Sequence, residues 1–542
     1  MNLPGIRPLV CWLVVPLLAY AEPSAIPHPP RVTNPAPALP IPSGPNGPDW
    51  ESIRAHYQAP EWFLNAKFGI FLHWGVYAVA ARQSEWYPRH MYSNPGIAEW
   101  HRQQFGPQDR FGYKDLIPLF RAEHFDAAAW ARLFKAAGAQ YVVPVAEHHD
   151  GFAMWDSALT RWNAKQMGPH RDVIGELAAA TRAEGMKFGV SYHRIENWSF
   201  MYPALNQPTD LFDPAYADFY GPPQPPPSGE QGAGEVMNGL TTQQSPAFLE
   251  EWLRRGQELI DKYEPDLIYF DNGVNGRGFD PIKLRFAAYY YNRAAGWHRQ
   301  VTLVAKGGNA PSGPAYLAGA VLDFERGHPA DILPAPWQTD NSVHSRWGYL
   351  EDTQYRGVGT LVRELIDNVS KGGNLLLNFA PRADGTFPEE QLALLRGIGQ
   401  WLALNGEAIY GTRPWHRFGE GSVGIGRPGQ PEDRARIQRE AVGDGPAPSY
   451  TGRDFRFTTR PARAGQPCAL YAIVMRWPAT GEALVTSLAT SASDGPRVEH
   501  VELLGAGPIS FVQDAAGLHL KLPATAPCEH ACVFKLTGTH LP

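Results

Sequence analysis

Four apolar segments of this sequence each end in side chains that can bind polar groups or transfer protons. They read Lys67-Phe-Gly-Ile-Phe-Leu-His-Trp-Gly75, Tyr141-Val-Val-Pro-Val-Ala-Glu-His-His-Asp150, Lys187-Phe-Gly-Val-Ser-Tyr-His193 and Asp266-Leu-Ile-Tyr-Phe-Asp271. Histidines and carboxylates of this kind act as general acids and bases, as nucleophiles or as metal ligands. Because they follow apolar runs rather than interrupt them, we expect them to gather at one rim of a buried parallel sheet.

The segments between these runs have the spacing of amphipathic helices. Asp126 is placed to cap a helix that carries Trp130 and Phe134 on one face, and further helices are expected at 172–184, 249–263 and 388–404. Additional strands are expected at 301–304, 320–324 and 375–379. Strands that alternate with helices predict an α/β protein with a (β/α)8-type barrel, whose active site lies at the carboxyl ends of the strands.

The two ends of the chain differ from this barrel, which we expect to span residues 50–414. Residues 1–21 have the features of a signal peptide, with Arg7, an apolar run from Leu9 to Leu18 and the sequence Ala19-Tyr-Ala21 before the expected cleavage site. Residues 22–49 are proline-rich and predict an extended, disordered linker. Short β-rich runs at 468–477, 497–504 and 518–522 predict that residues 415–542 form an all-β sandwich.

Composition and charge exclude some classes of protein function. The 542 residues carry a formal net charge of -6, which argues against a nucleic-acid partner. No stretch approaches the ~20 apolar residues of a membrane span, so we expect no membrane anchor. Without the signal peptide three cysteines remain, Cys468, Cys528 and Cys532, which allow at most one intramolecular disulfide or three reduced thiols. The oligomeric state is left open.

Four strings of the sequence resemble the α-L-fucosidases of glycoside hydrolase family 29. They are KFGIFLHWG at 67–75, EWY at 85–87, EHHDGF at 147–152 and SKGGNLLLN at 370–378, in consistent order and spacing from about Trp50 to about Trp415. The resemblance implies an exported, retaining exo-α-L-fucosidase that removes terminal α-L-fucosyl residues from oligosaccharides or glycoconjugates and needs no metal or cofactor. Export places it in the periplasm, outside the cell, or in a lysosome-type lumen if the source is eukaryotic.

Hydrolysis of a glycosidic bond by this route takes two carboxyl groups. Asp271 ends an apolar strand and matches the nucleophile of the resembled family. The acid/base matches Glu325, which precedes Trp337 by about the interval found in the family. Asp323 lies on the same side of the same strand by alternation and is the rival for this role.

The resemblance also implies a set of sugar-binding residues. Histidines would bond to the hydroxyls of the sugar, and tryptophan would shape its apolar side. The set is His73, Glu85, Trp86, His148, His149, Tyr192, His193 and Trp337. Adjacent His148 and His149 point oppositely in a regular strand, so both reach one ligand only where the strand ends. The family often has two tyrosines at the end of this strand, where this chain has Tyr192 followed by His193. The sugar contact implied for Tyr192 could therefore be made by His193 instead.

Two other hypotheses fit part of the pattern. A metal-dependent barrel hydrolase would use strand-end ligands, namely His73, His148, His149, Asp150, His193 and Asp271. A carbohydrate-binding protein with an inactive barrel would be expected to lack Asp271, which is present. We expect the proline-rich segment within 197–244 to decide leaving-group selectivity, and the sequence leaves open the natural glycan, its linkage, and the choice between L-fucose and L-galactose.

Overall fold

The computed structural model describes residues 37–201, 205, 207–221, 244–271, 274, 277–307, 314–423, 449–462, 467–490 and 496–541. The expected signal peptide and residues 222–243 of the expected selectivity loop lie outside these ranges. Within the described helices, none is both long enough and apolar enough to cross a membrane.

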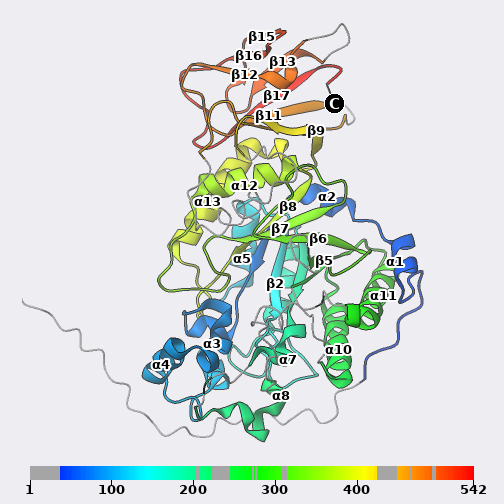
Figure 1. The fold of residues 1–542 in the computed structure, drawn as a ribbon, viewed down its shortest axis with the longest axis vertical. Helices are drawn as coiled ribbons and strands as arrows, with labels where there is room; N and C mark the ends of the chain where they lie inside the picture. Colours follow the sequence, from blue (N-terminus) through cyan, green and yellow to red (C-terminus); the bar gives the residue numbers. More distant parts are fainter. Residues whose placement is uncertain are drawn as a thin grey trace, which may run out of the picture.

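Eight parallel strands close into a barrel in sequence order, as predicted (Figure 1). The strands are β1 (Phe68–Leu72), β2 (Tyr141–Glu147), β3 (Lys187–Tyr192), β4 (Leu267–Phe270), β5 (Thr302–Lys306), β6 (Ala320–Glu325), β7 (Trp337–Ser342) and β8 (Gly373–Phe379). Strand β7 has the sequence WQTDNS and was not predicted, because it lacks the apolar run by which the other strands are recognised. All six of its residues are nevertheless buried.

Helices follow most of the barrel strands. The long helices are α5 (Ala127–Ala136), α6 (Val173–Ala183), α10 (Pro246–Tyr263), α11 (Asp280–Gly296), α12 (Val358–Ser370) and α13 (Glu389–Asn405). Asp126 accepts a hydrogen bond from the backbone N–H of Ala129 and caps α5 as expected. Gly372 adopts a φ of 94° between α12 and β8, a conformation that favours glycine. Within the described residues no helix connects β5 to β6 or β6 to β7.

Shorter helices surround the two ends of the barrel. Before β1 lie α1 (Trp50–His56) and α2 (Glu61–Ala66), and the β1–β2 connection holds α3 (Tyr87–Ser93) and α4 (Pro95–Gln104). The β3–β4 connection holds α7 (Asn197–Phe200) and α8 (Ala217–Tyr220). Phe63 of α2 packs into the barrel interior with Phe71, Tyr141 and Tyr269, so α2 closes the end opposite the strand C-termini.

The segment at residues 37–49 corrects part of the linker prediction. The backbone N–H of Leu39 donates to Gln257 Oε1 on α10 at 2.7 Å, and Gln257 Nε2 donates back to the Leu39 carbonyl. The backbone N–H of Asn46 donates to Asn292 Oδ1 on α11 at 2.9 Å. These bonds fasten residues 39–46 to the barrel, because side-chain amides of two helices satisfy the backbone of a proline-rich segment that lacks a regular structure of its own.

The C-terminal region is an all-β domain of two antiparallel sheets that share one apolar core, as predicted. One sheet has the order β14-β13-β17-β11-β10-β9 and the other β12-β16-β15. The strands are β9 (Arg413–Glu420), β10 (Phe455–Arg460), β11 (Ala469–Val474), β12 (Glu482–Val485), β13 (Arg497–Leu503), β14 (Gly507–Pro508), β15 (Phe511–Asp514), β16 (Gly517–Lys521) and β17 (Cys532–Thr539). All three cysteines are reduced, and the Sγ atoms of Cys528 and Cys532 lie 3.5 Å apart.

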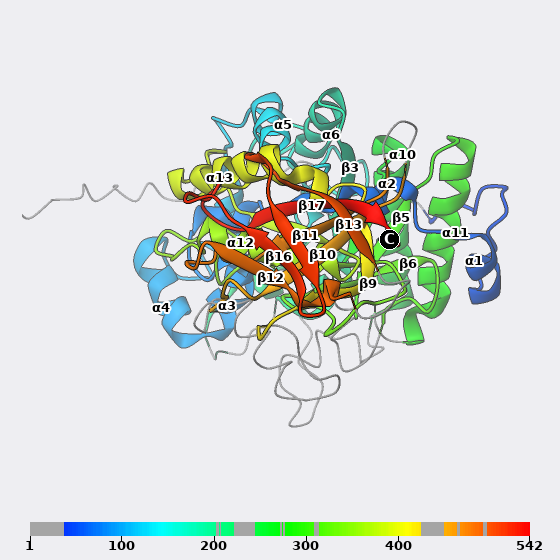
Figure 2. The ribbon, with the colours of Figure 1, turned by 90° about the horizontal axis from the view of Figure 1, so that it is seen from above.

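The β domain rests on α12 and α13 beside the barrel (Figures 1 and 2). A buried ion cluster joins the two parts, since Asp367 of α12 pairs with Arg456 of β10 at 2.5 Å and with Lys371 at 2.7 Å. Burial alone would raise the pKa of Asp367, but Lys371 and Arg456 lower the pKa well below its usual range. The carboxylate is therefore ionised, and its contribution to stability is lost only as the pH falls through this depressed pKa.

Asp367→Ala is expected to lower the free energy of unfolding by about 3–5 kcal/mol, because it leaves two buried cations without their counter-ion. Urea unfolding monitored by tryptophan fluorescence measures the change. The control is Glu389→Ala, which breaks an exposed ion pair with Arg396 and should cost less than about 1 kcal/mol. Equal losses in the two variants would contradict the role assigned to this cluster.

Candidate active site

A pocket opens at the carboxyl ends of the barrel strands, where the sequence predicted it. The pocket is small, with a cavity volume of about 70 Å³, or about 400 Å³ when the open space of its mouth is included. Twelve residues line it: His73, Glu85, Trp86, His148, His149, His193, Glu196, Asp271, Lys306, Glu325, Asp340 and Trp347. Eight of the ten predicted site residues are among them, and Lys306, Glu196, Asp340 and Trp347 are additions that sequence reasoning missed.

Lys306, the last residue of β5, holds the two expected catalytic carboxyl groups together. Its Nζ atom lies 2.6 Å from Asp271 Oδ1 and 3.1 Å from Glu325 Oε2. Two oxygens bound to one ammonium at these distances lie within about 6 Å of each other, close to the roughly 5–5.5 Å of a retaining glycosidase and below the roughly 6.5–9.5 Å of an inverting one. The geometry therefore fits attack by one carboxylate and proton transfer by the other.

The charge state of Asp271 suits a nucleophile. Burial alone would raise its pKa, but the Lys306 ammonium and His193 lower the pKa of Asp271 well below its usual range. Burial would lower the pKa of Lys306, yet Asp271, Asp340 and Glu325 together raise it well above its usual value. Asp271 is thus a carboxylate and Lys306 a cation throughout the physiological pH range.

The two acid/base candidates on β6 occupy different environments. The Glu325 side chain is 33 % exposed and lines the pocket. Asp323 is fully buried inside the barrel, where Oδ1 accepts from the Tyr269 hydroxyl and Oδ2 from Gln338 Nε2. Burial and the neighbouring Asp340 raise the pKa of Asp323 well above its usual range. Of this pair, Glu325 lines the pocket and Asp323 does not.

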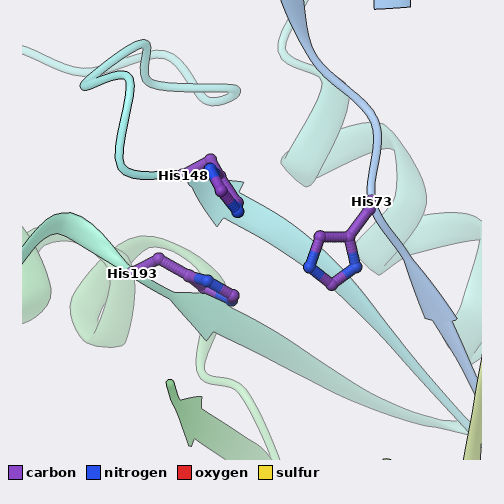
Figure 3. A group of neighbouring side chains, drawn as sticks. All are labelled: His73, His148 and His193. Carbon is purple, nitrogen blue, oxygen red and sulfur yellow. The ribbon is translucent and has the colours of Figure 1, made fainter. Parts of the chain in front are cut away.

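Three histidines from adjacent strands point their rings toward one common space (Figure 3). His73 follows β1, His148 follows β2 and His193 follows β3. Asn378 Oδ1 accepts from the backbone N–H of His73 and lies 2.8 Å from its Nδ1, so Nδ1 carries the proton and Nε2 is left as an acceptor. Burial, together with neighbouring rings, lowers the pKa of His73 and His148 well below the usual range, which keeps both rings neutral.

His149 follows His148 beyond the last residue of β2, so the strand's alternation no longer separates the two rings. Its Nδ1 donates to the His193 carbonyl at 3.1 Å, and its Nε2 lies 3.5 Å from Asp271 Oδ2. Burial would lower the pKa of His149, but Glu196, Asp271 and the His193 carbonyl outweigh it and raise the pKa to about 9. His149 is therefore a cation at neutral pH beside Asp271.

The remaining walls are aromatic and acidic. Glu85 is anchored, because its Oε2 accepts from the backbone N–H of Gly348 at 2.9 Å and bonds to Ser84 Oγ. The Trp347 ring covers His73 at a centroid distance of 5.2 Å and lies 5.4 Å from Lys306 Nζ. Trp86 meets His149 edge-on at 6.4 Å. An apolar wall beside hydroxyl-binding groups is what a sugar with one polar and one apolar face requires.

Tyr192 and Trp337 do not belong to this pocket, which corrects two predictions. Tyr192 alternates with His193 and points outward, stacks on Trp252 of α10 and donates its hydroxyl to the Trp252 carbonyl at 2.8 Å. Trp337 opens β7 rather than closing it, so it lies at the opposite end of the barrel and donates to the Lys371 carbonyl. Of the two competing residues on β3, His193 takes the place in the pocket.

Two groups of side chains have atoms close enough together to hold a metal ion, His73 with His148 and His193, and His149 with His193 and Asp271. The charges beside them oppose this role, since Lys306 Nζ already lies 2.6 Å from Asp271 and His149 is a second cation. Asp150 was also a candidate ligand in the metal hypothesis, but it accepts a hydrogen bond from the Tyr113 hydroxyl at 2.6 Å and does not line the pocket. The ammonium of Lys306 occupies the position that a cation would take next to the nucleophile.

A closed parallel barrel with a small pocket at its strand ends, where two carboxyl oxygens lie within about 6 Å of each other, has the arrangement of a barrel glycoside hydrolase. Comparison with known proteins gives the family. A family model described as alpha-L-fucosidase matches residues 39–407, and one described as the alpha-L-fucosidase C-terminal domain matches residues 450–537. The chain therefore belongs to the α-L-fucosidase family of glycoside hydrolases.

Individual relatives agree with this assignment. The chain is 31% identical over 505 residues to tissue alpha-L-fucosidase of Rattus norvegicus, covering 90% of this chain and 92% of the relative. It is 30% identical over 507 residues to the tissue alpha-L-fucosidase of Bos taurus, covering 91% of each. The crystal structure of Thermotoga maritima alpha-fucosidase in complex with fucose superposes with a TM-score of 0.67 at 27% identity, covering 91% of this chain and 100% of the other.

Proposed function

We propose that this protein is an exported, retaining exo-α-L-fucosidase that removes terminal α-L-fucosyl residues from oligosaccharides or glycoconjugates. The main support for the proposal is the pair Asp271 and Glu325, which the Lys306 ammonium holds together in a small pocket at the strand ends. Family membership supports fucose as that sugar. The small volume of the pocket supports removal of a terminal residue rather than cleavage within a chain.

In the first step, the ionised Asp271 attacks the anomeric carbon while Glu325 protonates the departing oxygen. Formation of the glycosyl ester removes the negative charge of Asp271. The Lys306 ammonium then lies beside the Glu325 carboxylate that the proton transfer has produced. In the second step this carboxylate takes a proton from water, which attacks the ester and releases the sugar with retained configuration.

The neutral histidines and the anchored Glu85 are assigned to the hydroxyls of the sugar. His73 Nε2 is an acceptor, because its Nδ1 proton is committed to Asn378. Glu85, fixed by Gly348, presents its second carboxylate oxygen to the pocket, and Trp86, His148, His149 and His193 complete the wall. Groups fixed by bonds of their own need little reorganisation when the sugar binds, and such preorganisation favours both affinity and rate.

Export rests on the sequence of residues 1–21, in particular Ala19-Tyr-Ala21 before Glu22. The periplasm or the extracellular space is the proposed location, or a lysosome-type lumen in a eukaryotic source. N-terminal sequencing of the protein recovered outside the cytoplasm tests this proposal, and the expected first residue is Glu22. Recovery of the uncleaved chain from the cytoplasm alone would contradict it.

The substrate is tested with a chromogenic α-L-fucoside and a panel of α1,2-, α1,3-, α1,4- and α1,6-linked fucosyl oligosaccharides. We expect release of free L-fucose from the fucoside and from at least one linkage, with no cleavage of the β-L-fucoside. Failure on every α-L-fucoside, by a folded protein, would contradict the proposed function.

Activity on the chromogenic fucoside is expected to be unchanged after dialysis against EDTA. The physical reason is that Lys306 and His149 already supply the positive charge beside Asp271, so no divalent ion is required there. The measurement is the ratio of kcat/KM before and after chelation. A loss that added zinc restores would favour the metal-dependent barrel hydrolase instead.

A further inference from the structure

Five carboxyl groups line the pocket, and one of them differs from the rest. Four of them have a partner within 3.1 Å: Asp271 and Glu325 pair with Lys306, Asp340 accepts from Tyr269, and Glu85 accepts from Gly348, whereas the ion-pair contact of Glu196 with His149 is longer, at 3.4 Å. Glu196 is 6 % exposed, and within the described residues neither of its carboxyl oxygens has a hydrogen-bond partner. A buried acid that faces a pocket without a hydrogen bond to either oxygen is an unusual arrangement in a native protein.

Glu196 is held in this position by bonds on both sides of it. The preceding Arg194 pairs with Glu147 at 2.6 Å, and the following Asn197 donates its side-chain N–H to the His149 carbonyl at 2.9 Å. The turn η4 (Arg194–Glu196) is therefore fastened to the end of β2. The direction of the Glu196 side chain follows from this anchoring, because the backbone on each side of it is fixed.

His149 lies between Glu196 and the proposed nucleophile Asp271. Its Nε2 lies 3.4 Å from Glu196 Oε2 and 3.5 Å from Asp271 Oδ2, so the imidazole stands between the two carboxyl groups. C2 is the ring carbon bonded to C1, the atom that Asp271 would attack, so we assign the substituent of C2 to the space beside His149. That substituent is the 2-hydroxyl of the sugar.

The chemistry of Glu196 suits a hydroxyl partner. Burial raises its pKa, and although His149 opposes the shift, the result is a pKa of about 8. The other charged groups that act on it are Asp271, Lys306 and Arg89. The raised pKa brings the protonated acid, with one O–H donor and acceptor oxygens, into the neutral pH range, and this form complements a hydroxyl that both donates and accepts.

We propose that Glu196 is a further sugar-binding residue, whose carboxyl group hydrogen-bonds the 2-hydroxyl of the sugar beside His149. This inference rests on the proposed function for the identity of the sugar. Hydrogen bonds to the 2-hydroxyl strengthen in the transition state of glycoside hydrolysis, so the residue contributes to turnover as well as to binding. Glu196 touches the substrate and takes no part in bond making or proton transfer.

The test compares the parent protein with Glu196→Ala and Glu196→Gln. Titration calorimetry at pH 6.5 gives the affinity for L-fucose and for 2-deoxy-L-fucose, and kcat/KM is measured on the chromogenic fucoside. We expect Glu196→Ala to bind L-fucose at least tenfold more weakly and to reduce at least threefold the parent's preference for L-fucose over its 2-deoxy analogue. Glu196→Gln, which resembles the protonated acid in shape and bonding, should stay within about fivefold of the parent.

The matched control is Glu176→Gln on helix α6, which removes a partly exposed ion pair with Arg171 and should leave every value unchanged. Should Glu196→Ala fail to fold, the decision rests on Glu196→Gln together with Glu196→Leu, which keeps the volume and loses the bond. The assignment is overturned if a folded variant without the carboxyl group, Glu196→Ala or Glu196→Leu, keeps the parent's preference for L-fucose over 2-deoxy-L-fucose. A parent that neither binds L-fucose nor cleaves the fucoside overturns the proposed function as well, so the two failures are distinguishable.

Discussion

Asp271→Ala is expected to lower kcat on an aryl α-L-fucoside by roughly 10⁴-fold or more, because covalent catalysis accounts for a large part of the rate. The variant should fold normally. Asp271 has 9 % relative exposure, and its neighbours Lys306, His149 and His193 line an open pocket that water can fill. Steady-state kinetics with the purified variant measure the loss. The control is Asp156→Asn, an exposed residue paired with Lys262, which should retain full activity.

Added azide gives this variant a second readout. Azide that replaces the Asp271 carboxylate attacks the face of the sugar that this residue used, so the product is the inverted β-L-fucosyl azide. Its anomeric configuration is read by proton NMR. A variant with nearly full activity, or one whose azide product keeps the α configuration, would show that another group is the nucleophile.

Glu325→Ala is expected to lower kcat/KM by a factor that depends on the leaving group of the substrate. An oligosaccharide needs its departing oxygen protonated, so kcat/KM should fall by roughly 10²–10⁴-fold, the usual contribution of general acid catalysis. A dinitrophenyl fucoside leaves without a proton, and its kcat/KM should fall far less. Azide should restore turnover and give the retained α-L-fucosyl azide, because it takes the place of the water that Glu325 activates in the second step.

Asp323→Asn is the matched comparison on the same strand. Asp323 lies beneath the pocket in a bonded cluster with Tyr269 and Gln338, so its replacement should affect stability and should not produce a dependence on the leaving group. If the dependence appears in Asp323→Asn and is missing in Glu325→Ala, the acid/base role belongs to Asp323. Equal losses of kcat/KM on both substrates in Glu325→Ala would also contradict the assignment.

The barrel was predictable wherever its strands are apolar. Segments such as Tyr141–Glu147 and Leu267–Phe270 carry continuous hydrophobic side chains, since both faces of a parallel strand are covered. Strand β7 could not be predicted in this way, because it is polar. Its side chains bond to other buried polar groups, as Gln338 does to Asp323 and Asn341 to Glu364. A buried polar strand is stable only when tertiary partners satisfy it, and hydrophobic periodicity gives no sign of them.

The same limit explains the site residues that were missed or misplaced. Lys306 ends a strand, so its type and place carried a signal, yet its role depends on three carboxyl groups from other strands. Trp337 was assigned from the family's spacing to Glu325, which does not reveal that it begins a strand and so lies at the far end of the barrel. His148, His149 and Asp271 were predictable because each directly follows an apolar run.

The central claim is that Asp271 forms a covalent bond to the sugar. Incubation with 2-deoxy-2-fluoro-α-L-fucosyl fluoride, followed by intact-mass and peptide mass spectrometry, tests it most directly. The fluorine at C2 slows both formation and hydrolysis of the ester, whereas the fluoride leaving group speeds formation alone, so the ester accumulates. The account predicts one added deoxyfluorofucosyl group per chain, located on Asp271, with loss of activity that returns as the ester hydrolyses. Labelling of another carboxyl group, or turnover with inversion and no label, would contradict it.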